Sequence, residues 1–151
     1  MASVSLTGSD VVVINGRIFN DMADGDFAKV DFETDMANMK VSKDGNTIFA
    51  LNETGRQSRV TLRVLLGSAD DVFLNSLLQG MLNDFASFNL LTGSFTKRVG
   101  DGAGTIKNVA YNMANGIFRR WPSAKSNAEG DVEQSVAVYE FAFRNQSRTV
   151  A

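Results

Sequence analysis

The chain has 151 residues, with 15 basic and 17 acidic side chains, no Cys, no His and 44% hydrophobic residues. This is the size and apolar content of a single domain with an ordinary core. Without Cys or His, the chain lacks the ligands of a Cys/His zinc site, a thiol nucleophile and the base of a Ser-His-Asp triad. Its net charge of −2 argues against the broad basic surface that binds duplex DNA by counterion release.

Short strands separated by tight turns are predicted for the first part of the chain. Val11 to Ile14 and residues 17–19 flank Asn15-Gly16, a dipeptide that accepts the positive φ angles of a two-residue hairpin turn. Apolar and charged residues alternate within 26–33, which predicts a strand with one face in water. The less regular segment 35–55 is interpreted as a protruding hairpin or a long loop.

The most regular alternation of the chain lies in residues 56–67. The apolar side chains point one way and the polar ones the other: Val60, Leu62, Val64 and Leu66 against Arg59, Thr61 and Arg63. Because side chains alternate across a strand, this pattern predicts a strand that is buried on one face.

One helix is predicted to follow this strand. Ser68 is placed to cap it, and Asp70 and Asp71 lie in its first turn, where the positive end of the helix dipole favours acids. Apolar residues then recur with the helical period: Leu74, Leu77, Leu78, Met81, Leu82 and Phe85. Gly80 lies inside the helix at a cost of roughly 1 kcal/mol relative to Ala, which suggests close packing there.

Two strands are predicted after the helix. The first, 88–99, is interrupted near Thr92-Gly93 and followed by a flexible glycine turn. The second, 105–121, has one face of small uncharged residues, and Asn115-Gly116 would alternatively place a turn in its middle. Trp121-Pro122 is expected to end this element.

The final strand is predicted over 132–143 and is apolar on both faces. Such a strand is unusual in a monomer of this size outside a parallel sheet, so a partner subunit is the expected second cover. Together the elements predict a mainly β domain with one helix, of the α+β class.

Sites for small ligands are not indicated. The acidic residues of 21–26 lack the ligand spacing of a calcium loop, and no carboxylate pair has the spacing of an acid/base catalyst. The glycines of 100–104 are not followed by the Lys-Ser/Thr and helix of a phosphate-binding loop. No apolar run reaches the roughly 20 residues of a membrane helix, and residues 1–8 are too polar for a signal peptide. We expect no cofactor, no metal, no catalytic residue and no membrane partner.

Six pieces of the chain stand out as a set: Asn15-Gly16-Arg17-Ile18, Ala23-Asp24-Gly25-Asp26, Lys43-Asp44-Gly45, Glu53-Thr54-Gly55, the strand Val60-Thr61-Leu62-Arg63-Val64-Leu65 and the helix through Phe73-Leu74-Asn75-Ser76-Leu77. In this order and spacing they resemble the tail tube proteins of contractile-tailed bacteriophages. The resemblance covers roughly residues 1–145, including a late Gly-Ile-Phe strand and a C-terminal aromatic strand.

The resemblance implies a β-sandwich or barrel-like subunit in which residues 1–151 form a single tail-tube domain. Six copies would form a ring, and stacked rings would make the hollow tail tube that conducts DNA during ejection into the bacterial host. Strands of neighbouring subunits would join into one hexameric inner β-barrel, and the segment 35–55 would reach the adjacent ring. The implied partners are tail sheath, baseplate and tail terminator proteins, with transient, non-specific passage of double-stranded DNA. The implied location is the virion tail, after assembly in the host cytoplasm.

Candidate site residues follow from these roles. The inter-ring stacking loop would comprise Met36, Met39, Asp44, Gly45, Asn46 and Glu53. The lumen would be lined by Asp31, Glu33, Thr61, Asn108 and Asn112, because a lining without a run of Lys and Arg would not retain DNA. Arg59 and Arg63 share the face of Thr61, so either they pair with acids or the strand faces the other way. The subunit interface would include Arg119, Trp121, Tyr139 and Phe141.

Other functions remain open at this point. A monomeric β-sandwich module that binds a carbohydrate would need exposed aromatic residues, for which Trp121, Tyr111 and Tyr139 are the candidates. The inner tube of a phage-derived secretion or contractile particle requires the same ring-and-stack physics as a phage tail. Met36 and Met39 would, in the plainer interpretation, cover the core of their own domain. An enzyme is disfavoured by the missing nucleophiles.

Overall fold

The computed structural model describes residues 3–8, 10–23, 27–32, 34–123, 126 and 128–151. Within these residues the fold is mainly β with one α-helix, as the sequence predicts. The elements in chain order are β1 (Ser5–Leu6), β2 (Val11–Ile14), β3 (Arg17–Ile18), β4 (Ala28–Asp31), β5 (Ala37–Val41), β6 (Thr47–Leu51), the 3-10 turn η1 (Glu53–Arg56), β7 (Ser58–Leu65), α1 (Ala69–Asn83), β8 (Leu91–Gly100), β9 (Ile106–Ser123), the 3-10 turn η2 (Val132–Ser135) and β10 (Val136–Val150).

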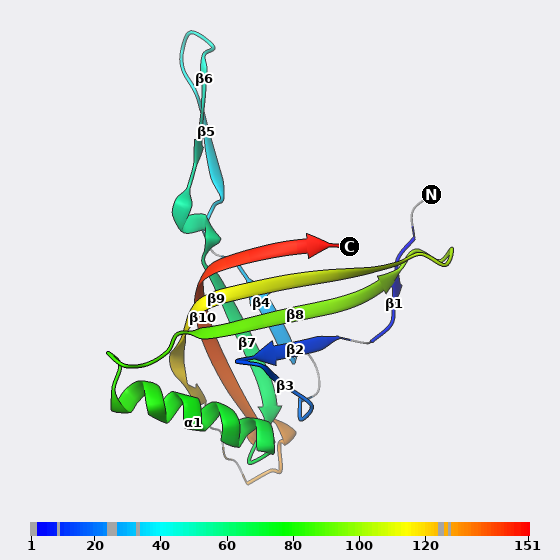
Figure 1. Cartoon of the computed structure of the whole chain (residues 1–151), viewed down its shortest axis with the longest axis vertical. Coiled ribbons are helices and arrows are strands. Elements are labelled where there is room, and N and C mark those ends of the chain that lie inside the picture. Colours follow the sequence, from blue (N-terminus) through cyan, green and yellow to red (C-terminus); the bar gives the residue numbers. More distant parts are fainter. Residues whose placement is uncertain (1–2, 9, 24–26, 33, 124–125, 127) are drawn as a thin grey trace.

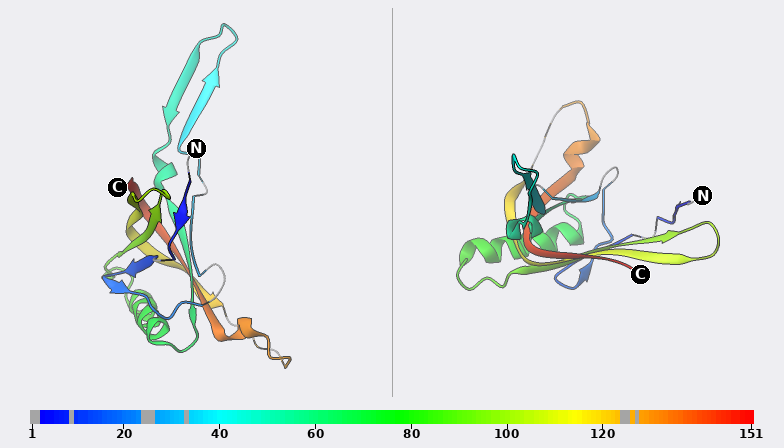
Figure 2. Two further views of the ribbon diagram at one scale, coloured as in Figure 1. Left: turned by 90° about the vertical axis from the view of Figure 1, so that its right-hand side faces the viewer. Right: turned by 90° about the horizontal axis from the view of Figure 1, so that it is seen from above.

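One antiparallel sheet organises the chain, with strand order β3-β2-β8-β9-β10-β7-β4 and with β1 beside the end of β8. The long strands β9 and β10 bend, so that their far parts run with β8 away from the helix (Figure 1). We call this projecting part the wing: residues 94–100 of β8, 106–112 of β9 and 145–150 of β10. Figure 2 shows that the wing extends to the side opposite α1.

A single core lies between α1 and one face of the bent sheet. In β7 the buried side chains Val60, Leu62 and Val64 face this core, and the polar residues between them lie on the other face, as predicted. The larger members of the core are Ile14, Leu62, Leu74, Leu91, Phe118, Tyr139, Phe141 and Phe143. Each fully buried Leu or Phe contributes about 1.5–3 kcal/mol relative to an exposed one, so this face determines which side of the sheet the helix covers.

The predicted hairpin near the N-terminus is confirmed. Val13 pairs with Ile18 and Ile14 with Arg17. Asn15 and Gly16 have φ angles of 50° and 81°, the left-handed pair that a two-residue hairpin turn of this twist requires.

The helix begins where the sequence predicts it but ends earlier than its apolar stripe. The Ser68 side chain accepts a hydrogen bond from the Asp71 backbone N–H at 3.3 Å. Leu82 is exposed, and Phe85 lies beyond the helix end and is also exposed. The buried part of the stripe therefore ends at Met81.

Gly80 does not mark close packing, and that prediction is wrong. A Cβ built on Gly80 would meet no heavy atom within 4 Å. We therefore expect Gly80→Ala to raise the free energy of unfolding by roughly 1 kcal/mol, through the higher helix propensity of Ala alone. Urea unfolding checks this. Gly67 is equally open but has a φ of 76°, so Gly67→Ala is the control that should lose stability; a loss in both variants would contradict the assignment of Gly80 to open space.

Strand β9 is continuous, so neither proposed interruption of it ends the strand. Asn115 has a φ of 57° and forms a bulge, because Leu91 pairs with Gly116 but Gly93 pairs with Met113. Trp121-Pro122 lies in a second irregularity of the ladder, where a missing N–H is tolerated. The strand therefore runs to Ser123.

The last strand begins and ends later than predicted. Residues 132–135 form η2, and β10 extends from Val136 to Val150. Asp131 begins the 3-10 turn by accepting a hydrogen bond from the Glu133 N–H. The second half of β10 belongs to the wing, which the apolar pattern of 132–143 did not indicate.

Segment 35–55 contains a hairpin that stands apart from the main sheet. β5 and β6 pair only with each other, from Ala37 with Leu51 to Val41 with Thr47. The hairpin projects along the long axis of the molecule, away from α1 (Figures 1 and 2). All residues of both strands are exposed.

Candidate assembly surfaces

The described residues offer surfaces rather than a chemical centre. No group of three or more Asp or Glu side chains among them could hold a metal ion. None of the helices in the described ranges is long and apolar enough to cross a membrane. The features that call for explanation are the outer face of the wing, its open edges and the exposed hairpin.

One face of the wing is polar and almost uncharged. Residues opposite each other in antiparallel strands share a face, and on the side away from the core the ladder brings together Ser94, Asn112 and Ser147, then Thr96, Ala110 and Thr149, then Arg98 and Asn108. Arg98 is the single charged residue of this set. Asn108 and Asn112, two of the predicted lumen residues, lie together here and are exposed.

The other predicted lumen residues lie elsewhere on the sheet. Thr61 pairs with Glu140 in the ladder between β7 and β10. We call this ladder, residues 58–65 and 136–143, the stem of the sheet; it lies outside the wing. Asp31 lies opposite Arg59, and its carboxylate is 3.6 Å from the Lys29 ammonium group. Glu33 falls outside the described residues. Asp31 and Thr61 therefore lie among charged residues, unlike the nearly uncharged face of the wing.

The arginines beside Thr61 do not mean that the strand is reversed. Arg63 Nη2 donates to Glu133 Oε1 at 2.7 Å. Since Val60 and Leu62 are buried on the opposite face, the first of the two alternatives, pairing with acids, holds for Arg63.

The wing has two open edges. β7 pairs with β10 only over residues 136–143, so within the described chain residues 145–150 have a strand neighbour on one side alone. On the far side, β8 is flanked by β1 and β2, whose outer backbone is covered by β3 only at Val13 and Ile14. Open edges expose unpaired N–H and C=O groups and are templates for pairing with another chain.

The hairpin carries an apolar face without a cover in its own chain. Met39 lies opposite Phe49, and these side chains are 66% and 76% exposed. Ala37 and Leu51 extend the same face, while Lys40 lies on the other. The interpretation that Met39 covers the core of its own domain is therefore wrong.

The remaining residues assigned to the stacking loop lie along the same hairpin or at its base. Met36, Asp44, Gly45, Asn46 and Glu53 are all exposed. Gly45, with a φ of 83°, forms the tip by donating its N–H to the Ser42 carbonyl at 3.0 Å. At the base, the Asn52 N–H donates to the Met36 carbonyl at 2.9 Å, which ties the two strands together.

Two of the four predicted interface residues are core residues. Tyr139 and Phe141 are 1% and 0% exposed because α1 covers their face of β10, so they are unavailable to another subunit and that prediction is wrong. The Tyr139 hydroxyl donates to Asp71 Oδ1 at 2.6 Å; burial, and then this bond, raise the pKa of the phenol above its ordinary value. Trp121 is 63% exposed. Arg119 lies 3.6 Å from Glu140.

The most buried acid of the described chain has a role that the sequence did not reveal. Asp70 is 0% exposed and accepts three hydrogen bonds, from Arg17 Nε at 3.0 Å and from the backbone N–H groups of Asn20 and Asp21 at 2.9 and 2.7 Å. It holds the end of the β2–β3 hairpin against the start of α1. An acid in a first helical turn is so common that no local signal distinguishes this one.

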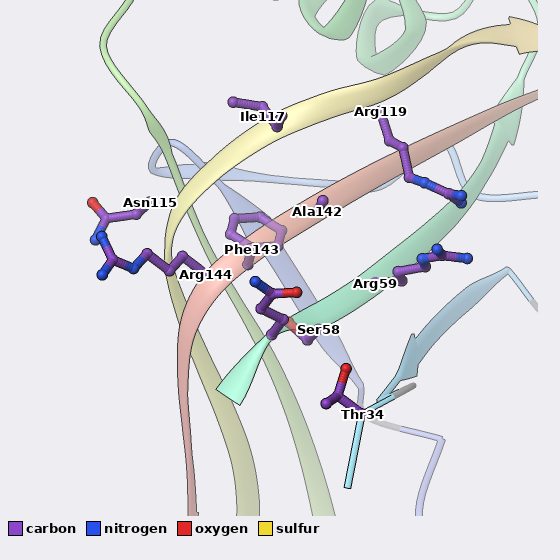
Figure 3. Close-up of a pocket in the computed structure, with 10 residues that line it drawn as sticks. Thr34, Ser58, Arg59, Asn115, Ile117, Arg119, Ala142, Phe143 and Arg144 are labelled. Atoms are coloured by element: carbon purple, nitrogen blue, oxygen red, sulfur yellow. The ribbon is translucent and has the colours of Figure 1, made fainter. Parts of the chain in front are cut away.

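A cavity of about 320 Å³ lies at the base of the hairpin, between β7, β9 and β10 (Figure 3). Arg59 and Arg119 point toward one side of it and Arg144 toward the other, next to Asn115. The lining is basic and polar and lacks an exposed aromatic ring, since Phe143 is buried. This cavity therefore does not have the stacking surface that a carbohydrate site needs.

Comparison with known proteins places the fold. Neither a protein-family model nor a curated protein sequence matches the chain. Solved structures do match. Among them are a sheath-tube complex of the extracellular contractile injection system PVC (TM-score 0.57, 10% identity, 94% of this chain and 87% of that one) and its sheath/tube terminator (0.55, 13%, 94% and 92%). Another is the tube-terminating cap of the anti-feeding prophage (0.57, 11%, 94% and 88%). At these identities the similarity concerns the fold, which is that of contractile injection system tube and terminator structures.

Proposed function

We propose that this chain is a structural subunit of a tail-type tube, in which residues 1–151 act as one domain and copies form hexameric rings that stack. The observation that carries the proposal is the wing, which combines a nearly uncharged polar face with two open edges. The similarity to contractile tube and terminator structures supports a structural role rather than an enzymatic one.

Closure of the ring would give hydrogen-bond partners to the unpaired backbone groups at the open edges. The outer edge of β10 in one copy would pair with the β1–β2 edge of the next, so that each copy supplies four strands: the β1–β2 edge, β8, β9 and β10. Six such copies would give about 24 strands and, at ~4.8 Å spacing and ~45° tilt, a barrel about 50 Å across. Closure of a sheet on itself removes the edges that otherwise lead to aggregation.

The nearly uncharged face of the wing would line the lumen, with Asn108 and Asn112 on its central strand. A polar surface with one arginine per copy offers few cations to phosphates, so DNA or protein would pass without being retained. Asp31 and Thr61 would lie outside the lining, on β4 and on the stem. Trp121 and Arg119 remain candidates for contacts between subunits.

The setting we propose is a contractile particle. A phage tail that conducts DNA and a phage-derived injection particle are both compatible with this subunit. The matched structures come from an extracellular contractile injection system and from the anti-feeding prophage. The partners would be the sheath, the baseplate and a tube terminator. The protein would be located in the tail of the particle after assembly in the host cytoplasm.

The β5–β6 hairpin would join successive rings. Its exposed apolar face is a surface that association would remove from water. The hairpin projects away from the sheet along the long axis of the molecule (Figure 1).

Electron microscopy of the purified chain across a concentration series tests this proposal. The chain should form rings and hollow tubes. A variant in which residues 38–50 are replaced by Asn-Gly should keep the thermal unfolding transition of the domain, because the hairpin lies outside the core, and should form rings but no tubes. Tubes of normal length from the shortened variant would contradict the stacking role of the hairpin. A wild-type chain that stays monomeric at every concentration would contradict the tube and favour a monomeric binding module.

A further inference from the structure

A second cavity lies at the opposite end of the molecule from the hairpin. It has a volume of about 440 Å³, within the range of ligand pockets. It is formed by the first half of α1, the loop that precedes α1, the end of β9 and the start of β10, and its lining includes Leu66, Val72, Pro122 and Ala137. Leu66 and Val72 are exposed at its rim.

The positions of cavity and hairpin fit a head-to-tail contact between copies. In Figures 1 and 2 the hairpin forms one end of the long axis, and α1 with η2 forms the other. The apolar face around Met39 and Phe49 therefore cannot reach the cavity of its own chain. A contact that joins two different surfaces at opposite ends of a subunit repeats from copy to copy without closing, as a stack of rings requires.

The charges of the two surfaces are complementary. The sequence has no Lys or Arg from residue 65 to residue 96, and the cavity wall includes Asp71. Over residues 37–51 the hairpin carries Lys43 in its turn and Lys40 on the face opposite Met39, against the single acid Asp44. The hairpin is thus net basic with one apolar face, and the cavity wall combines one acid with apolar side chains, which favours this pairing over one between two hairpins.

We infer that the β5–β6 hairpin of one copy docks into the α1 cavity of a copy in the adjacent ring, with the Phe49 ring as the inserted anchor. The inference rests on the proposed tube and adds the surface on the neighbouring copy that receives the hairpin. Asp71, which the Tyr139 hydroxyl and the Gly67 N–H already hold in place, lies in the wall of the receiving cavity.

Cysteine cross-linking in assembled tubes tests this contact, since the natural chain has no Cys. In the variant Phe49→Cys/Val72→Cys, mild oxidation should give a ladder of covalent multimers that reductant abolishes. The matched control Phe49→Cys/Gln79→Cys places the second thiol on an exposed part of α1 outside the cavity. We expect on the order of tenfold more cross-linked product from the first pair, because a disulfide forms only where Cα atoms come within about 7 Å. Mixed tubes of the two single variants should give dimers only.

The outcomes separate this inference from the proposed tube. Wild-type tubes together with variant tubes that give no ladder would overturn the docking site and leave the tube proposal standing. A wild-type chain that never forms rings or tubes would overturn both. Should Phe49→Cys prevent stacking, Met39→Cys/Asn75→Cys tests the same contact with the phenyl ring in place, and a ladder there supports the inference whereas its absence from intact tubes overturns it.

Discussion

Gly116→Ala is expected to lower the free energy of unfolding by about 3 kcal/mol, the upper part of the range for overpacked cores. A Cβ on Gly116 would lie 2.3 Å from Phe143 Cε1 and 2.4 Å from Cδ1, closer than carbon atoms approach without displacement. The Phe143 ring is buried and its centroid lies 6.2 Å from that of the Phe141 ring, so displacing it would disturb the packing of the core. Urea unfolding monitored by circular dichroism measures the loss.

The control for this prediction is Gly100→Ala in β8, where a Cβ would meet its nearest atom at 3.5 Å and the expected change is within about 0.5 kcal/mol. A double-mutant cycle with Phe143→Leu identifies the cause. If the overlap with the ring is responsible, the combined variant should lose less stability than the sum of the two single losses. Additive losses would show that the substitution destabilises the domain through the backbone at Gly116 and not through an overlap of the new methyl group with the Phe143 ring.

Asp70→Ala is expected to cost about 3 kcal/mol, because removing one partner of a buried pair leaves uncompensated polar groups. The N–H groups of Asn20 and Asp21 would lose their acceptor, and the Arg17 guanidinium would lose its carboxylate. The Arg17 side chain is 37% exposed and lies 5.3 Å from the Phe73 ring, so solvent and the ring offset part of its loss. For this reason we place the cost at the low end of the range for buried pairs.

Two further variants test the Asp70 prediction by chemical unfolding. Asp84→Asn, an acid at the exposed far end of the same helix, should change stability by less than about 0.5 kcal/mol. Arg17→Met should cost less than Asp70→Ala, since the two backbone N–H groups keep their acceptor. Equal losses in Arg17→Met and Asp70→Ala would show that the ion pair, and not the backbone hydrogen bonds, carries the contribution of Asp70.

The hydrogen bonds of Asp70 are also expected to affect the formation of rings. They fix the β2–β3 hairpin to α1, and β2 is part of the edge that we propose pairs with β10 of the next subunit. A variant that loosens this hairpin should therefore form rings less readily than its remaining stability alone would indicate.

The candidate site was predictable where it depends on local pattern. The alternation of residues in 105–121 puts Asn108 and Asn112 on one face of a strand, and the structure has them on one face of β9. That Ser94 and Ser147 complete this face is a matter of register with β8 and β10. Register between distant strands is decided by non-local packing, so no window of the sequence contains it.

The sequence by itself determined the class of the fold, because strands and helices leave short periods in the chain: the alternation around Val60, the helical spacing from Leu74, and the Asn15-Gly16 turn all appear as predicted. The tertiary structure alone decided which of two apolar faces of β10 is buried, which removes Tyr139 and Phe141 from any interface. It also decided that Gly80 faces open space while Gly116 accommodates a phenyl ring, and that Asp70 is a buried acceptor. The reason is physical: each of these depends on a group tens of residues away, whose approach is determined by how the whole core packs.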